Sequence, residues 1–184
     1  MKVSMSHIFV TIPRLRPDVP ATLAMLPRAD GPSKSPKLQA YPSWAWQQGL
    51  HDHCASLVSV FRSRLDPCGR LWVLDTGSVH ALCEFEQVCP PKLVVFNADG
   101  TESFRVIVPE EVLHPDSMLV ALALDRRGAE RLQSCPQMSE TVVYISDIIP
   151  GIIVFDVATQ TFWRHEHQTM SPDPAFASIS IRGM

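Results

Sequence analysis

The sequence predicts an all-β fold that forms part of a β-propeller, in which small four-stranded sheets stack on one another. Two stretches of the chain each contain four β-type segments in the same order. Prolines number 16, many of them before residue 45, and they favour loops and edge strands over helices. Near-continuous apolar runs at Leu93–Phe96 and Ile152–Phe155 are typical of strands that are covered on both faces. A β-sandwich with coincidentally similar hairpins is the alternative architecture.

Residues 1–54 are expected to form an N-terminal hairpin and a proline-rich loop that belong to an incomplete blade. Ile8–Ile12 has the composition of a short strand that stops at Pro13, and Ala21–Leu26 can pair back with it. Residues 28–43 are rich in Pro, Ser, Lys and Gly, which indicates a solvated loop.

Residues 55–110 are expected to form the first complete blade. Its first hairpin turns at Leu65–Gly69, where Pro67 fixes one φ angle and Gly69 accepts a positive one. Four consecutive antiparallel strands then make a β-meander. The predicted strands are Leu57–Phe61, Arg70–Asp75, Lys92–Asn97 and Ser103–Val108.

Residues 111–168 repeat this pattern as a second blade, at a period of about 60–70 residues. The second strand of each unit ends in an aspartate. Residues 169–184 are expected to begin a further, truncated blade, so that the chain is too short to close a propeller by itself. The predicted strands of the second blade are Met118–Asp125, Val142–Asp147, Ile152–Asp156 and Thr161–His165.

Composition excludes several classes of protein. Apolar residues make up 46% of the 184 residues, which argues against global disorder. The formal charge is −3 and no basic stripe is present, so nucleic-acid binding has no electrostatic support. No apolar run approaches the ~20 residues that span a bilayer. Met1–Phe9 lacks the apolar stretch of a signal peptide.

Several segments resemble, in order along the chain, the yellow/major royal jelly protein family. The most specific is Cys68–Gly77, which resembles the signature segment of the family. The others are Phe9–Arg14 with Val19–Leu23, Tyr41–Trp44, Cys89–Phe96, Pro115–Ser117, Tyr144–Asp147 and Gly151–Phe155.

This resemblance implies a secreted insect protein with a six-bladed propeller. Members of the family act in cuticle pigmentation and melanin formation, in dopachrome conversion, as nutritive proteins, or as binders of small biogenic amines. The sequence departs from the family by lacking the usual signal peptide and the later blades. An incomplete gene model, a truncated paralogue and a splice form each remain open as the reason.

Four of the five cysteines can be assigned to the two faces of the propeller disc. Cys68 and Cys135 each precede a second strand, whereas Cys54 precedes a first strand and Cys89 a third strand. We therefore predict the disulfides Cys54–Cys89 and Cys68–Cys135, each contributing about 2–4 kcal/mol in an oxidising compartment, and a free Cys83. Five free thiols are the alternative.

Four acidic or polar residues are candidates for a role near the propeller axis. Asp75 and Asp147 end second strands, where they either face a central channel or, as we favour, cap turns through side-chain to backbone bonds. Asp116 and Ser117 stand where an inner strand begins, and they are the predicted ligand-binding residues of a channel.

Histidines and tryptophans offer weaker signals. The tracts His51–His53 and His165–His167 each place two histidines on one face of an extended chain, but two ligands do not make a metal site, and we predict none. The four tryptophans either pack in the core between blades, as we favour, or form a stacking surface for an aromatic amine. They are Trp44, Trp46, Trp72 and Trp163.

The sequence contains no nucleophile elbow, phosphate loop or paired-carboxylate motif, and no cofactor is expected. By resemblance, we expect an extracellular protein that binds or converts catecholamine-derived melanin precursors, as in dopachrome conversion. A non-catalytic structural, nutritive or amine-binding protein is one alternative. A non-functional fragment is another, and a truncated chain of this kind is expected to be inactive.

Overall fold

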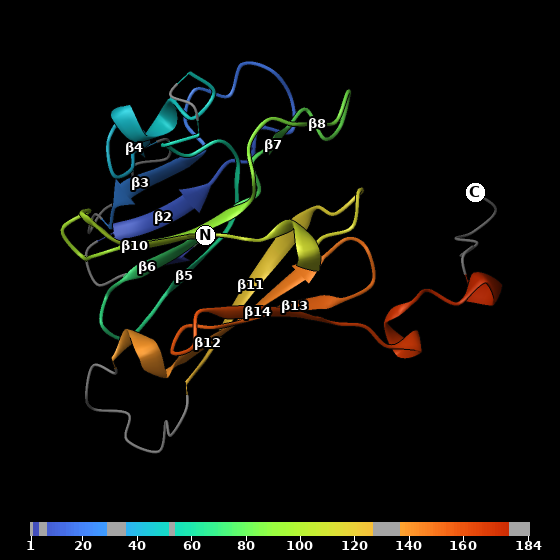
Figure 1. Ribbon diagram of the computed structural model, residues 1–184. Helices are drawn as coiled ribbons and strands as arrows, with labels where there is room; N and C mark the ends of the chain where they lie inside the picture. The colour runs from blue at the N-terminus through green and yellow to red at the C-terminus, as the bar shows by residue number, and fades with distance from the viewer. Residues whose placement is uncertain (1, 4–6, 29–35, 52–53, 127–136, 177–184) are drawn as a thin grey trace.

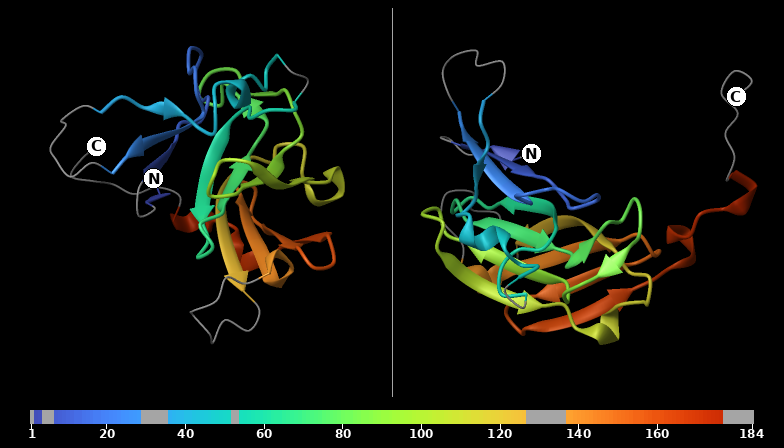
Figure 2. Two further views of the ribbon diagram at one scale, coloured as in Figure 1. Left: turned by 90° about the vertical axis from the view of Figure 1, so that its left-hand side faces the viewer. Right: turned by 90° about the horizontal axis from the view of Figure 1, so that it is seen from above.

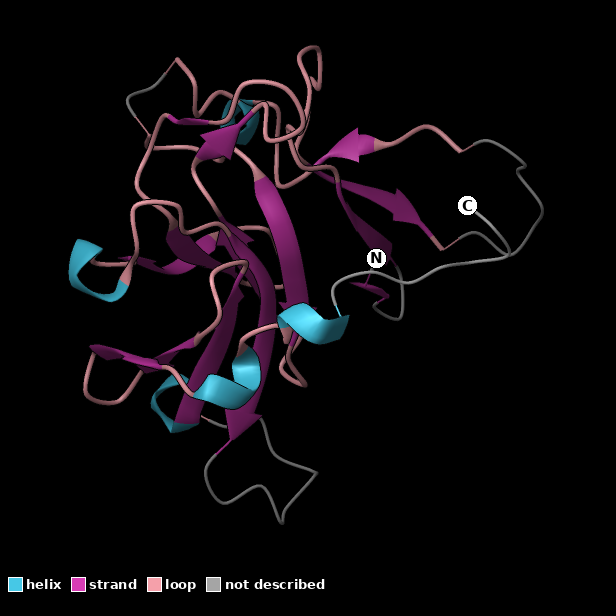
Figure 3. Ribbon diagram, turned by 90° about the vertical axis from the view of Figure 1, so that its right-hand side faces the viewer, coloured by secondary structure: helices cyan, strands magenta, loops and turns pink. Residues whose placement is uncertain are grey.

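The computed structural model describes residues 2–3, 7–28, 36–51, 54–126 and 137–176 (Figure 1). Within these ranges the chain is built from β-strands, and its helices are single 3-10 turns (Figure 3). None of these helices has the length or apolar character that spanning a bilayer requires. The short helices are η1 (Ala45–Gln47), η2 (Glu110–Val112), η3 (Met138–Glu140), η4 (Gln168–Met170) and η5 (Pro174–Phe176).

Three four-stranded antiparallel sheets follow one another along the chain and stack as blades of a partial β-propeller (Figure 2). The N-terminal sheet contains β1 (Lys2–Val3), β2 (His7–Thr11), β3 (Leu23–Pro27) and β4 (Gln39–Ala40). The middle sheet, in the order β10-β9-β6-β5, contains β5 (Val60–Leu65), β6 (Leu71–Asp75), β9 (Lys92–Phe96) and β10 (Glu102–Ile107). The third sheet contains β11 (Leu119–Arg126), β12 (Thr141–Asp147), β13 (Ile152–Asp156) and β14 (Thr161–His165).

The middle sheet is covered on both faces, as its apolar runs predict. Every residue of β6 and β9 is buried. Successive side chains of a strand point to opposite faces. Accordingly, Trp72 and Leu74 pack against the third sheet, whereas Leu71 and Val73 pack against the N-terminal sheet.

The third sheet is covered on one face only within the described part of the chain. Val143, Ile145 and Phe155 lie in the core shared with the middle sheet. The opposite face carries Tyr144 and Trp163, of which 37% and 45% remain exposed.

The first strand of the middle sheet begins later than the sequence predicts. Strand β5 starts at Val60 and not at Leu57. The preceding residues remain buried, but their amides bind elsewhere: those of Val58 and Ser59 donate to the carboxylate of Asp75. At this point the Asp75 side chain, and not the backbone of a partner strand, accepts the hydrogen bonds of the amides. The apolar pattern of the sequence does not predict this exchange.

The expected loop over residues 28–43 also needs correction. Gln39–Ala40 pairs with β3 and completes the N-terminal sheet, while residues 29–35 lie outside the described residues. The connection between the paired strands β6 and β9 contains an extra hairpin of β7 (Ser78–Val79) and β8 (Glu86–Gln87). In the predicted further blade, residues 168–176 contain η4 and η5, and residues 177–184 are not described.

Candidate active site

The functional groups gather at one face of the disc, where the second strands end and the third strands begin. Asp75 closes β6 and Asp147 closes β12, at the same edge as the loops that enter β5 and β11. Within each sheet, antiparallel pairing places the start of the first strand beside the end of the second strand. We call this edge of the middle and third sheets the Asp face.

In the middle sheet, Asp75 caps three backbone amides. Its Oδ1 accepts from Ser59 N at 2.8 Å and Gly77 N at 3.1 Å, and its Oδ2 accepts from Val58 N at 2.8 Å. Lys92 Nζ lies 3.0 Å from Oδ2, and both side chains are almost fully buried. The predicted capping role of Asp75 is therefore confirmed.

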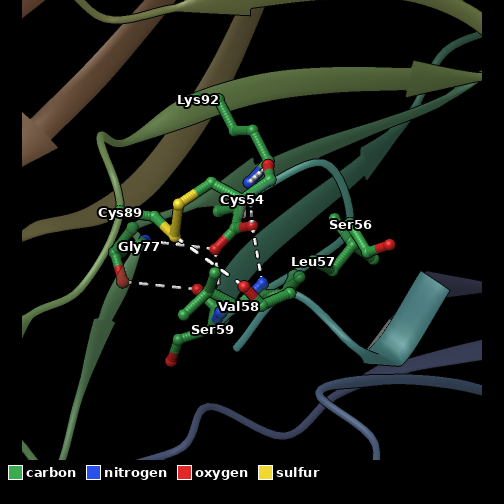
Figure 4. A network of polar contacts seen from close by, with 12 residues as sticks. Cys54, Ser56, Leu57, Val58, Ser59, Gly77, Cys89 and Lys92 are labelled. Atoms are coloured by element: carbon green, nitrogen blue, oxygen red, sulfur yellow. Dashed lines mark hydrogen bonds and ion pairs between the residues drawn. A yellow bond between two sulfur atoms is a disulfide. The ribbon is translucent and has the colours of Figure 1, made fainter. Parts of the chain in front are cut away.

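Gly77 is required by this arrangement. Its φ of +66° lies in the left-handed region, and a Cβ there would come within 1.9 Å of the Cys89 carbonyl oxygen. Figure 4 shows Gly77 beside Cys89, whose amide donates to the Gly77 carbonyl at 3.0 Å. The chain can thus fold tightly over the buried carboxylate only with glycine here.

In the third sheet, Asp147 repeats the same cap. Its Oδ1 accepts from Met118 N at 2.9 Å and Ile149 N at 3.3 Å, and the Ser117 hydroxyl donates to Oδ2. The cation is now Arg164, from β14, whose Nη1 lies 2.9 Å from Oδ2. The capping role predicted for Asp147 is likewise confirmed.

A disulfide joins Cys54 to Cys89 at the Asp face, the pair that the sequence predicts. The carbonyl oxygen of Cys54 accepts a hydrogen bond from Lys92 Nζ at 3.2 Å, so the bridge contacts the buried ion pair (Figure 4). Cys68 is also disulfide-bonded, and its predicted partner Cys135 lies outside the described residues. Cys83 is free and exposed.

A polar chain leads from the Asp147 cap to the surface. The Arg164 guanidinium bridges the carboxylates of Asp147 and Glu166 and also donates to Ile149 O at 3.1 Å. Glu166 in turn lies 2.7 Å from Nε2 of His114, which comes from the loop between β10 and β11. Two groups capable of proton transfer therefore meet at the Asp face.

Hydrogen bonds set the charge state of Glu166. The bond from His114 and, next, that from Arg164 lower the pKa of Glu166 below its ordinary value of 4.5. The Glu166 carboxylate lies 2.7 Å from one ring nitrogen of His114, Nε2. A histidine ring that is oriented by a carboxylate is suited to proton transfer.

A pocket of about 290 Å³ lies beside this pair, between the loop that enters β9 and the loop that enters β11. Its polar lining residues include Gln87, Glu110, His114 and Ser117. The remaining walls are largely apolar and rich in proline. A small apolar pocket with a few convergent polar groups is the usual form of a ligand site.

The two residues predicted to bind ligand are placed differently. Ser117 lines the pocket and donates to Asp147, whereas Asp116 is exposed and is not part of the pocket lining.

Several residues of the site were not predicted from the sequence, namely His114, Glu110 and Arg164. Glu166 was noted only as part of the tract His165–His167, which was considered as a possible metal site. The contact between His114 and Glu166 spans 52 residues, so no local pattern announces it.

Among the described residues, no three His, Cys, Asp or Glu side chains converge in a way that would hold a metal ion. The first histidine tract is only partly described, because Asp52 and His53 lie outside the described residues.

The tryptophans divide into two groups. The core role that we favour holds for Trp72, which is fully buried, and for Trp46, which packs edge-on against Phe96. It is wrong for Trp44 and Trp163, which are 60% and 45% exposed.

A buried arginine is a further feature without a signal in the sequence. Arg14 follows β2, and all its side-chain nitrogens donate to backbone carbonyls, including Val19 O at 3.0 Å and Gln47 O at 2.7 Å. Other partners are Leu57 O and Val58 O, at the entry to the middle sheet. Burial lowers the pKa of Arg14, and the charge of Asp75 opposes that effect. Arg14 ties the N-terminal sheet to its neighbour.

Stacked four-stranded sheets with repeated aspartate caps define the chain as part of a β-propeller. The family model described as "Major royal jelly protein" matches residues 58–184. The chain belongs to the major royal jelly protein family, which includes the yellow proteins.

Individual relatives agree with this assignment. The chain is 30% identical over 182 residues to a dopaminechrome tautomerase of Drosophila melanogaster, covering 97% of this chain and 37% of the relative. It is 32% identical to the L-dopachrome tautomerase yellow-f of the same fly, covering 96% and 40%, and 32% identical to major royal jelly protein 1 of Apis mellifera, covering 96% and 39%. The chain therefore spans less than half the length of these relatives.

Proposed function

We propose that this protein binds catecholamine-derived quinones at the pocket of the Asp face and converts them by tautomerisation. The observation that carries the proposal is the His114–Glu166 pair, whose Nε2 and carboxylate lie 2.7 Å apart at the rim of the pocket. Relatives named as dopaminechrome and L-dopachrome tautomerases support the same reaction class.

The reaction needs only proton transfer. Conversion of an aminochrome to its dihydroxyindole breaks two ring C–H bonds and forms two O–H bonds at the quinone oxygens, with no net change in atoms or electrons. In each of these two transfers the imidazole of His114 accepts a carbon-bound proton, Glu166 stabilises the imidazolium that forms, and the proton is returned to a quinone oxygen. A positioned general base contributes about 10²–10⁴-fold to such a step.

Arg164 acts as a positioning residue for this base. It holds Glu166 against the buried Asp147, and only 10% of its side chain is exposed. Gly151 makes room for it, because a Cβ at that position would lie 2.7 Å from Nη2. The pair at the surface is thus anchored to the rigid strand ends beneath it.

We further propose that the protein works in an oxidising, extracellular compartment and serves melanin formation. The Cys54–Cys89 disulfide supports this, because structural disulfides persist mainly in secreted proteins.

The colour of dopachrome and dopaminechrome gives a direct test. The purified 184-residue chain contains both the His114–Glu166 pair and the pocket, so we expect it to bleach at least one of them faster than buffer does, contrary to the inactivity expected of a truncated chain. His114→Gln should slow the protein-dependent rate about 10²-fold or more. His167→Gln is the matched control, since among the described residues the His167 side chain bonds only to Thr169. A rate equal to that of buffer, or equal rates for the two variants, would refute the catalytic proposal.

A further inference from the structure

Two acidic residues lie at the pocket of the Asp face. Glu110, an exposed residue on η2, lines the pocket, and Glu166, whose pKa is lowered, contacts the lining residue His114. Among the described residues that line the pocket, none is a lysine or an arginine.

The nearest cations are already committed to other anions. Lys92 follows Pro91 of the pocket wall, but its Nζ is bound to Asp75 and to the Cys54 carbonyl and is buried. Arg164 is shared between Asp147 and Glu166. Neither cation offers an uncompensated positive charge to a bound ligand.

The remaining walls favour a small, flat and apolar ligand. Val88, Pro90, Pro91 and Leu113 contribute them, and the volume of about 290 Å³ is at the lower end of small-molecule pockets. A fused two-ring quinone is of suitable size and shape.

We infer that this pocket selects aminochromes and catecholamines that lack a carboxylate, and that Glu110 imposes the selection. The inference rests on the proposed function for its substrate class, and it divides that class in two. Two relatives carry the names of substrates that differ by this group, because L-dopachrome has a carboxylate and dopaminechrome has none. A carboxylated ligand in this pocket would meet a like charge at Glu110 without a cation to offset it.

The size of the preference follows from Coulomb's law. Two unit charges about 6 Å apart in a partly exposed pocket interact strongly enough to change an affinity by about three- to tenfold. Because salt screens exposed charges over about 10 Å at 0.1 M, the preference should shrink as ionic strength rises.

The test measures binding and turnover separately. Calorimetry in anaerobic buffer compares dopamine with L-dopa, which differ by the carboxylate and do not tautomerise, and initial rates compare dopaminechrome with L-dopachrome. The unsubstituted chain is expected to prefer the carboxylate-free member by about three- to tenfold in each pair. Glu110→Gln should bring the ratio close to one, mainly by improving the carboxylated ligand.

Glu111→Gln is the matched control, because Glu111 is exposed on the same η2 turn but does not line the pocket. It should leave both ratios unchanged. A binding preference that Glu110→Gln removes, without any bleaching of either quinone, would uphold the selection and refute catalysis. Bleaching without a preference, a preference that survives Glu110→Gln, or no binding of either ligand at millimolar concentration would overturn the inference.

Discussion

The carboxylate of Asp75 and the ammonium of Lys92 form an ion pair of 3.0 Å, with 0% and 3% of their side chains exposed. Two charges removed from water in this way depend on each other. Loss of one partner leaves the other without compensation in a medium of low polarity, and that cost exceeds the net gain from forming the pair.

Replacing Lys92 by methionine should therefore destabilise the chain severely. Lys92→Met keeps the aliphatic stem but isolates the Asp75 carboxylate, and a loss of about 3–5 kcal/mol in the free energy of unfolding is expected. Urea titration followed by tryptophan fluorescence measures it. Glu102→Gln is the control, since the Glu102–Arg105 pair is about one third exposed and should contribute less than about 1 kcal/mol. Equal effects of the two substitutions would contradict the assignment of a sealed pair.

The Cys54–Cys89 disulfide should stabilise the fold by restricting the unfolded chain. It closes a sequence separation of 35 residues, for which about 2–4 kcal/mol is expected. The variant Cys54→Ala/Cys89→Ala tests this by urea unfolding without reducing the second bridge at Cys68. Cys83→Ala, at an exposed free thiol, should change the stability by no more than about 0.5 kcal/mol. A double variant as stable as Cys83→Ala would show that the bridge is energetically neutral.

Arg14→Met should loosen the N-terminal sheet selectively. Buried carbonyls such as Leu57 O and Gln47 O would lose their donor, at about 1–3 kcal/mol each. Hydrogen exchange should then accelerate in β2 and β3 but remain slow in β12 and β13. Arg16→Met, at an exposed position nearby, should alter neither region. Uniform acceleration across all sheets would argue against a local joint.

Tyr41 should make the protein sensitive to strongly alkaline conditions. Burial, followed by the charge of Asp99, raises the pKa of Tyr41 from 10.0 to about 12. Because the folded state retains the phenol proton longer than the unfolded state, stability is complete below pH 10 and falls as the pH rises from 10 to about 12. Stability curves over this range should show the decline, and Tyr41→Phe should flatten it. An unchanged slope in Tyr41→Phe would exclude Tyr41 as the cause.

Sequence-based prediction succeeded where a rule of local chemistry sufficed. The apolar run Leu93–Phe96 predicted a strand buried on both faces, and the strand Ile152–Asp156 matches the structure residue for residue. The capping roles of Asp75 and Asp147 also followed, because an aspartate at a strand end is suited to bind backbone amides.

Prediction failed where a contact depends on distant parts of the chain. His114 and Glu166 are 52 residues apart and meet only because the last strand of one sheet ends where the loop into its first strand begins. Arg14 likewise finds Gln47 and Leu57 through the stacking of two sheets. Tryptophan is a residue type that often packs in a core, and only the arrangement of the sheets shows that Trp163 lies on the exposed face of the third sheet.

The change of cation between the two aspartate caps has a consequence for how each cap behaves. In the first cap, Lys92 from the third strand binds both Asp75 and the carbonyl of the disulfide-bonded Cys54, and the ion pair is almost completely buried. Arginine from the fourth strand extends the second cap to the surface, because it joins the buried Asp147 carboxylate to Glu166, which in turn contacts the exposed His114. The same aspartate cap is thus sealed in the middle sheet and linked to exposed titratable groups in the third sheet.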